Sequence, residues 1–129
     1  ASLLAVEVDK RMKDSGVRAF GVHPGGIMTP LQRHLQQEEM IALGWMDKDG
    51  QPTERVAKMF KTPTQGASTT LWAATSPQLD NIGGVYCENC DVASSTDEGE
   101  NSRYIGVNDW AVDSEEASRL WHETELMLS

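Results

Sequence analysis

Residues 17–29 of the chain are Val-Arg-Ala-Phe-Gly-Val-His-Pro-Gly-Gly-Ile-Met-Thr. The first part, Val17 to Val22, is short, apolar and β-branched at both ends, as is typical of a strand buried in a parallel sheet. His23-Pro24-Gly25-Gly26 ends this strand, because Pro24 cannot donate a backbone hydrogen bond and glycines adopt conformations that other residues avoid. The sequence therefore predicts a buried strand followed by a turn of bare backbone.

Further elements lie on both sides of this strand. Leu3 to Lys13 has a helical pattern, and Gly16, a natural left-handed cap, follows its end. Thr62-Pro63-Thr64-Gln65 has capping-box spacing with proline at the first helical position, so we expect a helix from Gln65 to about Ala74. Gly84-Val85-Tyr86-Cys87 then predicts a second short strand.

The two terminal helices are amphipathic. In the first, the apolar residues are Leu3, Leu4, Val6, Val8 and Met12, and the polar ones are Glu7, Asp9, Lys10, Arg11 and Lys13. A last helix is expected to begin at Ser114-Glu115-Glu116 and to continue through Leu128. Its apolar side consists of Ala117, Leu120, Trp121, Leu126 and Met127 or Leu128.

The order of these elements predicts the α/β class. A strand, a crossover helix and a second strand form a parallel unit, which is almost always right-handed. Between strand and helix, Thr29-Pro30 predicts a helix start, and irregular apolar spacing predicts broken helices to about Met46. Residues 47–52 form a turn or loop, and polar residues 88–103 suggest a surface loop.

Composition excludes some function classes. The chain of 129 residues has a net charge of -9, and such a surface repels nucleic-acid backbones. No apolar run approaches the roughly 20 residues of a membrane helix. Cys87 and Cys90 supply two ligands of the four that zinc needs, and His23, His34 and His122 are scattered, so we expect no zinc. Two reduced thiols in a cytoplasmic protein are the simpler interpretation.

Four segments, in order along nearly the whole chain, resemble short-chain dehydrogenases/reductases, most closely the branch of retinol dehydrogenases and WW-domain-containing oxidoreductase. They are residues 17–29, Leu3-Leu4-Ala5-Val6-Glu7-Val8-Asp9, Lys61-Thr62-Pro63-Thr64-Gln65-Gly66-Ala67 and Gly83-Gly84-Val85-Tyr86-Cys87-Glu88-Asn89-Cys90. The resemblance implies one NAD(P)-binding Rossmann-type domain with a doubly wound parallel sheet. Residues 1–129 would supply its C-terminal portion: the last two strands, the crossover helix, a substrate lid at 27–60 and the terminal helix.

The same resemblance implies a nicotinamide site, for NAD or NADP, just after the first strand. Ligands of open parallel sheets bind beyond the carboxyl ends of the strands, and a backbone N–H and C=O around Ile27 suit a carboxamide. The implied cofactor contacts are Pro24, Gly25, Gly26, Ile27 and Thr29. In the lid, Met28, Leu31 and Leu35 suggest a small apolar alcohol or carbonyl substrate, and core packing explains the same residues.

Two motifs of the family have no counterpart in these residues. The family's glycine-rich phosphate turn and its proton-transferring Ser, Tyr and Lys have no match, because neither Tyr86 nor Tyr104 is followed by Lys four residues later. We therefore expect an oxidoreductase moving hydride between NAD(P) and an alcohol or carbonyl, with the 129-residue chain inactive by itself.

Two alternatives remain. One is a non-catalytic truncated fragment that acts only by association, as a homo-oligomer or with a complementary N-terminal piece. The other is a thiol–disulfide or metal protein built on Cys87 and Cys90. Among single residues, His34 is interpreted as solvent-facing more readily than as a substrate contact, and His23 as a core or backbone-paired histidine. The four tryptophans, Trp45, Trp72, Trp110 and Trp121, are interpreted as packing anchors.

Overall fold

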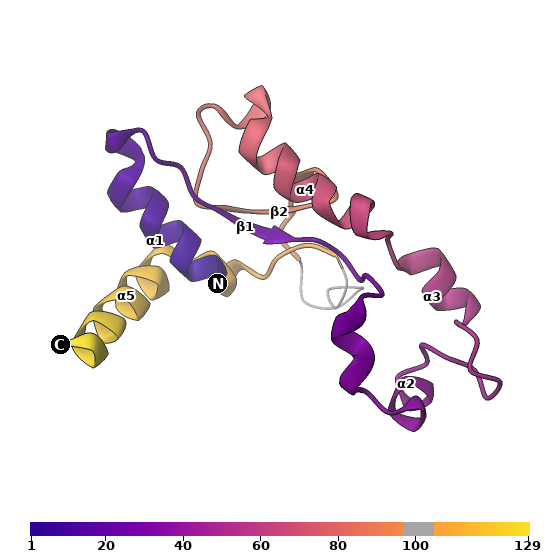
Figure 1. The fold of residues 1–129 in the computed structure, drawn as a ribbon. Helices are drawn as coiled ribbons and strands as arrows, with labels where there is room; N and C mark the ends of the chain where they lie inside the picture. Colours follow the sequence, from indigo (N-terminus) through magenta and orange to yellow (C-terminus); the bar gives the residue numbers. More distant parts are fainter. Residues whose placement is uncertain (97–104) are drawn as a thin grey trace. The chain divides into compact units, whose positions relative to one another are not determined.

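The computed structural model describes residues 1–96 and 105–129. Tyr104 and residues 97–103 of the polar segment expected to be a loop lie outside these residues. The chain divides into two compact units, of which the first comprises Ala1–His23 and Ser68–Ser129 and the second Pro24–Ala67 (Figure 1). The predicted lid, 27–60, lies within the second unit. Within the described residues, no helix has the length and apolar character needed to cross a membrane.

The first unit contains a mixed sheet of three strands in the order β1-β2-β3. Strand β1 (Phe20–His23) pairs in parallel with β2 (Val85–Glu88), with Phe20 opposite Val85 and His23 opposite Glu88. The prediction of two neighbouring parallel strands is thus confirmed. Strand β1 begins later than predicted, because the N–H of Ala19 is turned toward the carboxylate of Asp9.

The third strand was not predicted. Strand β3 (Asp91–Val92) pairs antiparallel with β2 inside the stretch that polar composition indicated to be a loop. A two-residue turn joins the strands, and both turn residues have left-handed backbones, with φ of 51° at Asn89 and 59° at Cys90. A tight hairpin turn needs that conformation, which asparagine tolerates better than most residues. Local turn geometry therefore overrides composition here.

Two helices pack against each other beside the sheet. Helix α1 (Ser2–Met12) continues into the 3-10 turn η1 (Lys13–Ser15), and Gly16 follows with φ of 77°, as predicted. Helix α1 contacts both β1 and β2 and lies against α5 (Ser114–Leu128), the helix expected at that position (Figure 1). Short 3-10 turns at η3 (Pro77–Leu79) and η4 (Asp109–Ala111) complete the unit.

Glu7 and Asp9, two polar residues of the expected amphipathic pattern, are buried in α1. Glu7 is 2% exposed and Asp9 5% exposed, whereas Leu4, placed on the apolar side, is 50% exposed. Both carboxylates are buried because partners from elsewhere in the unit hold them. Arg18 forms two hydrogen bonds to Asp9, of 2.8 and 3.0 Å, and Ser118 of α5 donates to Glu7 over 2.9 Å.

One expected packing residue is exposed. Trp110 is 69% exposed, so its interpretation as a packing anchor is wrong. It lies in η4, a turn too short to present a buried face. By contrast, Trp121 of α5 is packed beneath the guanidinium of Arg11, 4.6 Å from the ring centre.

The second unit consists of short elements. They are η2 (Pro30–His34), α2 (Gln37–Ala42) and α3 (Glu54–Met59). The first two agree with the broken helices expected before Met46. Helix α3 was not predicted; its N-cap, Thr53, accepts a hydrogen bond from the backbone of Val56. Helix α4 (Pro63–Thr75) begins with the predicted capping box, since Thr62 and Gln65 exchange backbone-to-side-chain hydrogen bonds of 2.9 and 3.2 Å.

Candidate functional site

The predicted cofactor segment, residues 24–29, directly follows the carboxyl end of β1. Its backbone needs glycine at one position, because Gly25 has φ of 89°. Ile27 and Thr29 are half-buried. Ile27 forms an isolated parallel bridge with Lys61, and its side chain fills the space that a side chain at Gly66 would take. Residues that follow the lid in sequence, Lys61 and Gly66, therefore hold Ile27 in place within the second unit.

At Gly25 and Gly26 a larger side chain would meet neighbouring residues of the second unit. A Cβ at Gly25 would lie 2.9 Å from Cδ of Lys61, and one at Gly26 would lie 3.0 Å from Cε1 of Phe60. The backbone N–H of Lys61 also donates to the carbonyl of Gly26 over 2.8 Å. The Phe60 ring meets Trp45 edge-on at 5.5 Å. One side of each glycine is thus covered by the chain itself, and an approaching ring has to use the remaining surface.

A side-chain carboxamide is bound at the end of this segment. The Nε2 atom of Gln32 donates to the carbonyl oxygen of Ile27 over 3.0 Å. Its Oε1 atom accepts from the backbone N–H of Thr29 over 2.7 Å and from the Thr29 hydroxyl over 3.1 Å. The backbone carbonyl of Ile27 and the two donors of Thr29 therefore fit a primary carboxamide, which has one acceptor oxygen and two N–H donors.

Of the three residues predicted to contact substrate, two are exposed to solvent. Met28 is 37% exposed and Leu31 is 74% exposed, while Leu35 is half-buried. They present apolar surface on the second unit, and His34 beside them is exposed. Trp45, interpreted as a packing anchor, is half-buried against Phe60.

A second polar group lies at the carboxyl ends of β1 and β2 in the first unit. The carboxylate of Glu88 is buried and accepts from the backbone N–H of Gly106 over 2.6 Å. His23 Nδ1 lies 3.7 Å from the same carboxylate, and its ring stacks near Tyr86. Burial, together with the charge of Glu88, raises the pKa of the Tyr86 hydroxyl. The hydrogen bond to Glu88 therefore holds Gly106 at the carboxyl end of β2.

The two cysteines differ in their surroundings. Cys87 is fully buried in β2, and burial, with the nearby Asp91, raises the pKa of its thiol, which makes it a poor nucleophile. Cys90 is exposed, and its backbone N–H donates to the buried hydroxyl of Thr69 over 3.2 Å. No group of three potential metal ligands occurs in residues 1–96 or 105–129. The absence of stoichiometric zinc stays a prediction.

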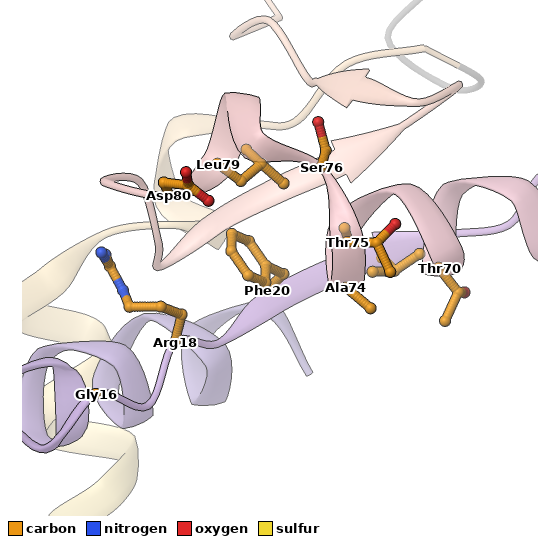
Figure 2. A pocket seen from close by; sticks show the side chains of 11 residues that line it. Gly16, Arg18, Phe20, Thr70, Ala74, Thr75, Ser76, Leu79 and Asp80 are labelled. Atoms are coloured by element: carbon orange, nitrogen blue, oxygen red, sulfur yellow. The ribbon is translucent and has the colours of Figure 1, made fainter.

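A cavity of about 560 Å³ lies in the first unit, away from the carboxyl ends of the strands (Figure 2). It is open to solvent between β1 and the 68–75 part of α4. Phe20 points into it from the strand, with Arg18 and Asp80 at one end. The other lining residues are Gly16, Val22, Thr70, Ala73, Ala74, Thr75, Ser76 and Leu79. Its lining mixes apolar side chains with polar and charged ones.

Sequence reasoning missed three residues of the cofactor segment's surroundings. Phe60 and Lys61 could not be found, because the bridge that brings them to residues 25–27 joins parts of the chain more than 30 residues apart. Gln32 had a usable signal. Thr29 and Gln32 have the same spacing as Thr62 and Gln65, which did predict a capping box.

Comparison with known proteins gives consistent relatives, although no family model matches the chain. A probable oxidoreductase of Streptomyces lividans is 38% identical over 112 residues, which cover 87% of this chain and 37% of that protein. The short-chain dehydrogenase/reductase prx1 of Penicillium roqueforti is 34% identical over 123 residues, covering 95% of this chain and 34% of that protein. Human retinol dehydrogenase 11 is 33% identical over 91 residues, covering 70% and 25%.

The chain therefore spans roughly a third of the length of the first two relatives: 37% of the Streptomyces lividans protein and 34% of the Penicillium roqueforti protein. Their similarity extends over most of the chain, and the parallel α/β arrangement of β1 and β2 is compatible with part of a Rossmann-type sheet. Together, these observations show that the chain is related to the short-chain dehydrogenase/reductase superfamily of oxidoreductases.

Proposed function

We propose that this chain forms the nicotinamide end of an NAD(P) site in an oxidoreductase that moves hydride between the cofactor and an alcohol or carbonyl. Residues 24–27 and Thr29 would contact the nicotinamide, and Met28, Leu31 and Leu35 would face a small apolar substrate. The whole protein's activity, its choice of NAD or NADP and its substrate belong to this proposal. The relatives named above, a probable oxidoreductase and a short-chain dehydrogenase/reductase, support it.

The observation that supports the proposal best is the set of polar groups at residues 27–29. They follow a parallel strand at its carboxyl end, where open α/β sheets bind ligands. They also accommodate a primary carboxamide, since that of Gln32 is bound there. The nicotinamide group would supply the hydride chemistry when bound. The backbone of this segment would orient the ring, and the Thr29 hydroxyl would fix the carboxamide oxygen.

The proposal is tested by an NMR titration of the ¹⁵N-labelled 129-residue chain with nicotinamide mononucleotide. This probe carries the ring and one phosphate, so it does not require the rest of a dinucleotide site. We expect shifts concentrated in the amides of Gly25, Gly26, Ile27 and Thr29. A Thr29→Val variant should bind more weakly, and Thr53→Val, which removes a similar cap elsewhere in the second unit, should bind like the parent. Shifts confined to other residues, or none at millimolar probe, contradict the proposal.

A second candidate function is association without catalysis. Strand β1 is terminal in the sheet of the described residues, and the open cavity beside it has the half-buried Phe20 and the exposed Ala74 in its lining. Both features favour a partner chain, which would be a second copy or a complementary N-terminal piece. The two candidates differ in the titration above, because association alone requires no nicotinamide binding.

A further inference from the structure

The side chain of Gln32 forms hydrogen bonds to three groups at residues 27–29. Its amide oxygen receives two donors, both from Thr29, and its amide nitrogen faces the carbonyl of Ile27. The partners fix the orientation of the amide, since the reverse orientation would place donors against donors. Both ends of the carboxamide are therefore used at once.

The nicotinamide ring carries the same chemical group. A primary carboxamide bound at this segment would use the Ile27 carbonyl as acceptor and the Thr29 N–H and hydroxyl as donors. In the free chain these three groups are already occupied by Gln32. Two carboxamides cannot hold the same three partners, so Gln32 and a nicotinamide exclude each other here.

We propose that Gln32 is an internal placeholder for the nicotinamide carboxamide and that it swings out when the cofactor binds. The inference rests on the proposed function and names a further residue that sets cofactor affinity. Gln32 is half-buried in η2, a five-residue turn whose Leu31, Arg33 and His34 are exposed. The side chain can therefore leave toward solvent without moving a packed neighbour on either side in sequence.

A purely structural role for Gln32 predicts the opposite result. Thr29 and Gln32 also form the capping box of η2. If capping were the whole role, removing Gln32 would loosen residues 27–29 and weaken nicotinamide binding. If Gln32 competes, its removal frees the three groups and strengthens binding. The sign of the change in affinity therefore separates the two roles.

The experiment measures the dissociation constant of nicotinamide mononucleotide for the 129-residue chain by ¹⁵N NMR. We expect Gln32→Ala to bind the probe about three- to tenfold more tightly than the parent, as for the loss of one or two competing neutral hydrogen bonds. Gln32→Glu should not bind more tightly, because a carboxylate there still accepts from Thr29. The matched control is Gln65→Ala, which removes the same kind of capping box at α4 and should leave the affinity unchanged.

A second measurement uses the parent chain alone, so it does not depend on the folding of a variant. The side-chain NH₂ signals of Gln32 should move toward those of solvent-exposed glutamines as the probe saturates the site. Nicotinate, whose carboxylate cannot donate to the Ile27 carbonyl, should leave the hydrogen bond from Gln32 Nε2 to that carbonyl in place and move these signals less. If the probe shifts residues 27–29 but Gln32→Ala does not tighten binding or the NH₂ signals stay put, the placeholder is wrong and the proposed function stands. If residues 27–29 do not respond in any variant, both are wrong.

Discussion

The buried carboxylate of Asp9 links α1 to other segments of the first unit. The Asp9 carboxylate accepts two hydrogen bonds from Arg18 and a third from the N–H of Ala19 at 3.1 Å. A side chain at Gly83 would collide with Asp9 and with the Arg18 guanidinium. One carboxylate therefore joins the helix, the start of β1 and the turn before β2. A buried ion pair of this kind is costly to break from one side only.

Replacing Asp9 by asparagine keeps the shape and removes the charge that faces Arg18. We expect Asp9→Asn to lower the free energy of unfolding by about 2–3 kcal/mol, measured by urea denaturation followed by circular dichroism. The control is Glu54→Gln. Its ion pair with Lys58 is exposed, at 83% and 73% of the two side chains, and should contribute less than about 0.5 kcal/mol. Equal effects of the two substitutions would contradict the role of Asp9.

Acid should destabilise the chain through the same residues. Hydrogen bonds from Arg18 hold the pKa of Asp9 below its ordinary 3.8. Burial by itself would raise the pKa of Glu7, but hydrogen bonds from Arg11 and Ser118 outweigh it and the pKa lies below the ordinary 4.5. Because both folded-state values are depressed, their stabilisation is full above the unfolded values and is lost as the pH falls through the folded ones.

The test is the free energy of unfolding at a series of pH values below about 5. We expect it to fall steadily with pH in the parent chain. The fall should be shallower in Asp9→Asn and in Glu7→Gln, because each variant removes one of the two groups that bind protons on unfolding. Parallel pH profiles for the parent and both variants would show that these carboxylates do not control acid stability.

The sequence predicts a residue's role when the signal is local. Gly16 after a helix and the Thr62–Gln65 spacing involve neighbours in the chain, and both predictions are confirmed. The partners of Glu7 include Ser118, which is 111 residues away, so no pattern within α1 could reveal that this glutamate is buried. The same limit applies to Phe60 and Lys61 beside the two glycines.

At the scale of elements, the β2–β3 hairpin shows how a short turn governs pairing. Cys90 has φ of 59°, a conformation in which a residue with a Cβ is strained. Its backbone N–H is nevertheless anchored by the buried Thr69 hydroxyl. Asn-Gly is the preferred pair for a two-residue hairpin turn of this handedness. The chain therefore has cysteine where glycine would be more stable.

We expect Cys90→Gly to raise the free energy of unfolding by about 0.5–1 kcal/mol, because glycine adopts a positive φ without steric cost. The N–H remains in this variant, so its hydrogen bond to Thr69 is kept, and the 4.0 Å contact between Cys90 Sγ and Thr69 Oγ1 is lost here and in Cys90→Ala alike. Cys90→Ala serves as control, since it removes the thiol and leaves the strained backbone. Thermal and urea unfolding measure both. A stabilisation that is equal in the two variants would assign the effect to the thiol and not to the turn.

Element prediction succeeded where hydrophobic pattern and end signals agreed. Helix α5 spans Ser114–Leu128, as expected, and its Asp113 cap accepts hydrogen bonds from Glu115 and Glu116. It failed for β3 and α3, whose two and six residues are too few to establish a period. The candidate site lay between these cases. Residues 24–29 were named from the family resemblance, and their role stays a prediction, whereas the contacts of their glycines with Lys61 and Phe60 could not be predicted from any local pattern.

For the whole chain, we predict no NAD(P)-dependent turnover of alcohols or carbonyls by the 129 residues alone. Proton transfer to or from the substrate oxygen needs a donor within hydrogen-bond reach. The 24–29 segment offers backbone groups and one hydroxyl, and no Tyr is followed by Lys at the family's spacing. The measurement is the absorbance of NADH and NADPH with a panel of apolar aldehydes and ketones. Turnover that survives further purification would contradict this prediction.

The chain is also expected to associate in solution through the face that contains β1 and the cavity. Within the described residues β1 is the terminal strand of the sheet, so its outer edge presents backbone groups that another strand could pair with. The cavity beside it is open to solvent, and its lining includes the half-buried Phe20 and the exposed Ala74, whose apolar surface association would cover. These two features adjoin on one face, which is why association should use both.

Light scattering coupled to size exclusion should therefore detect oligomers of the 129-residue chain. Two substitutions on α4 locate the surface. Ala74 lines the cavity and is exposed, so Ala74→Glu should raise the dissociation constant at least about tenfold, because an unpaired charge would be buried in the contact. Leu71 is 63% exposed on the same helix but does not line the cavity, so Leu71→Glu should change it little. A folded monomer at high concentration excludes this association. Oligomers that respond to Leu71→Glu and not to Ala74→Glu would move the contact to another face of the helix.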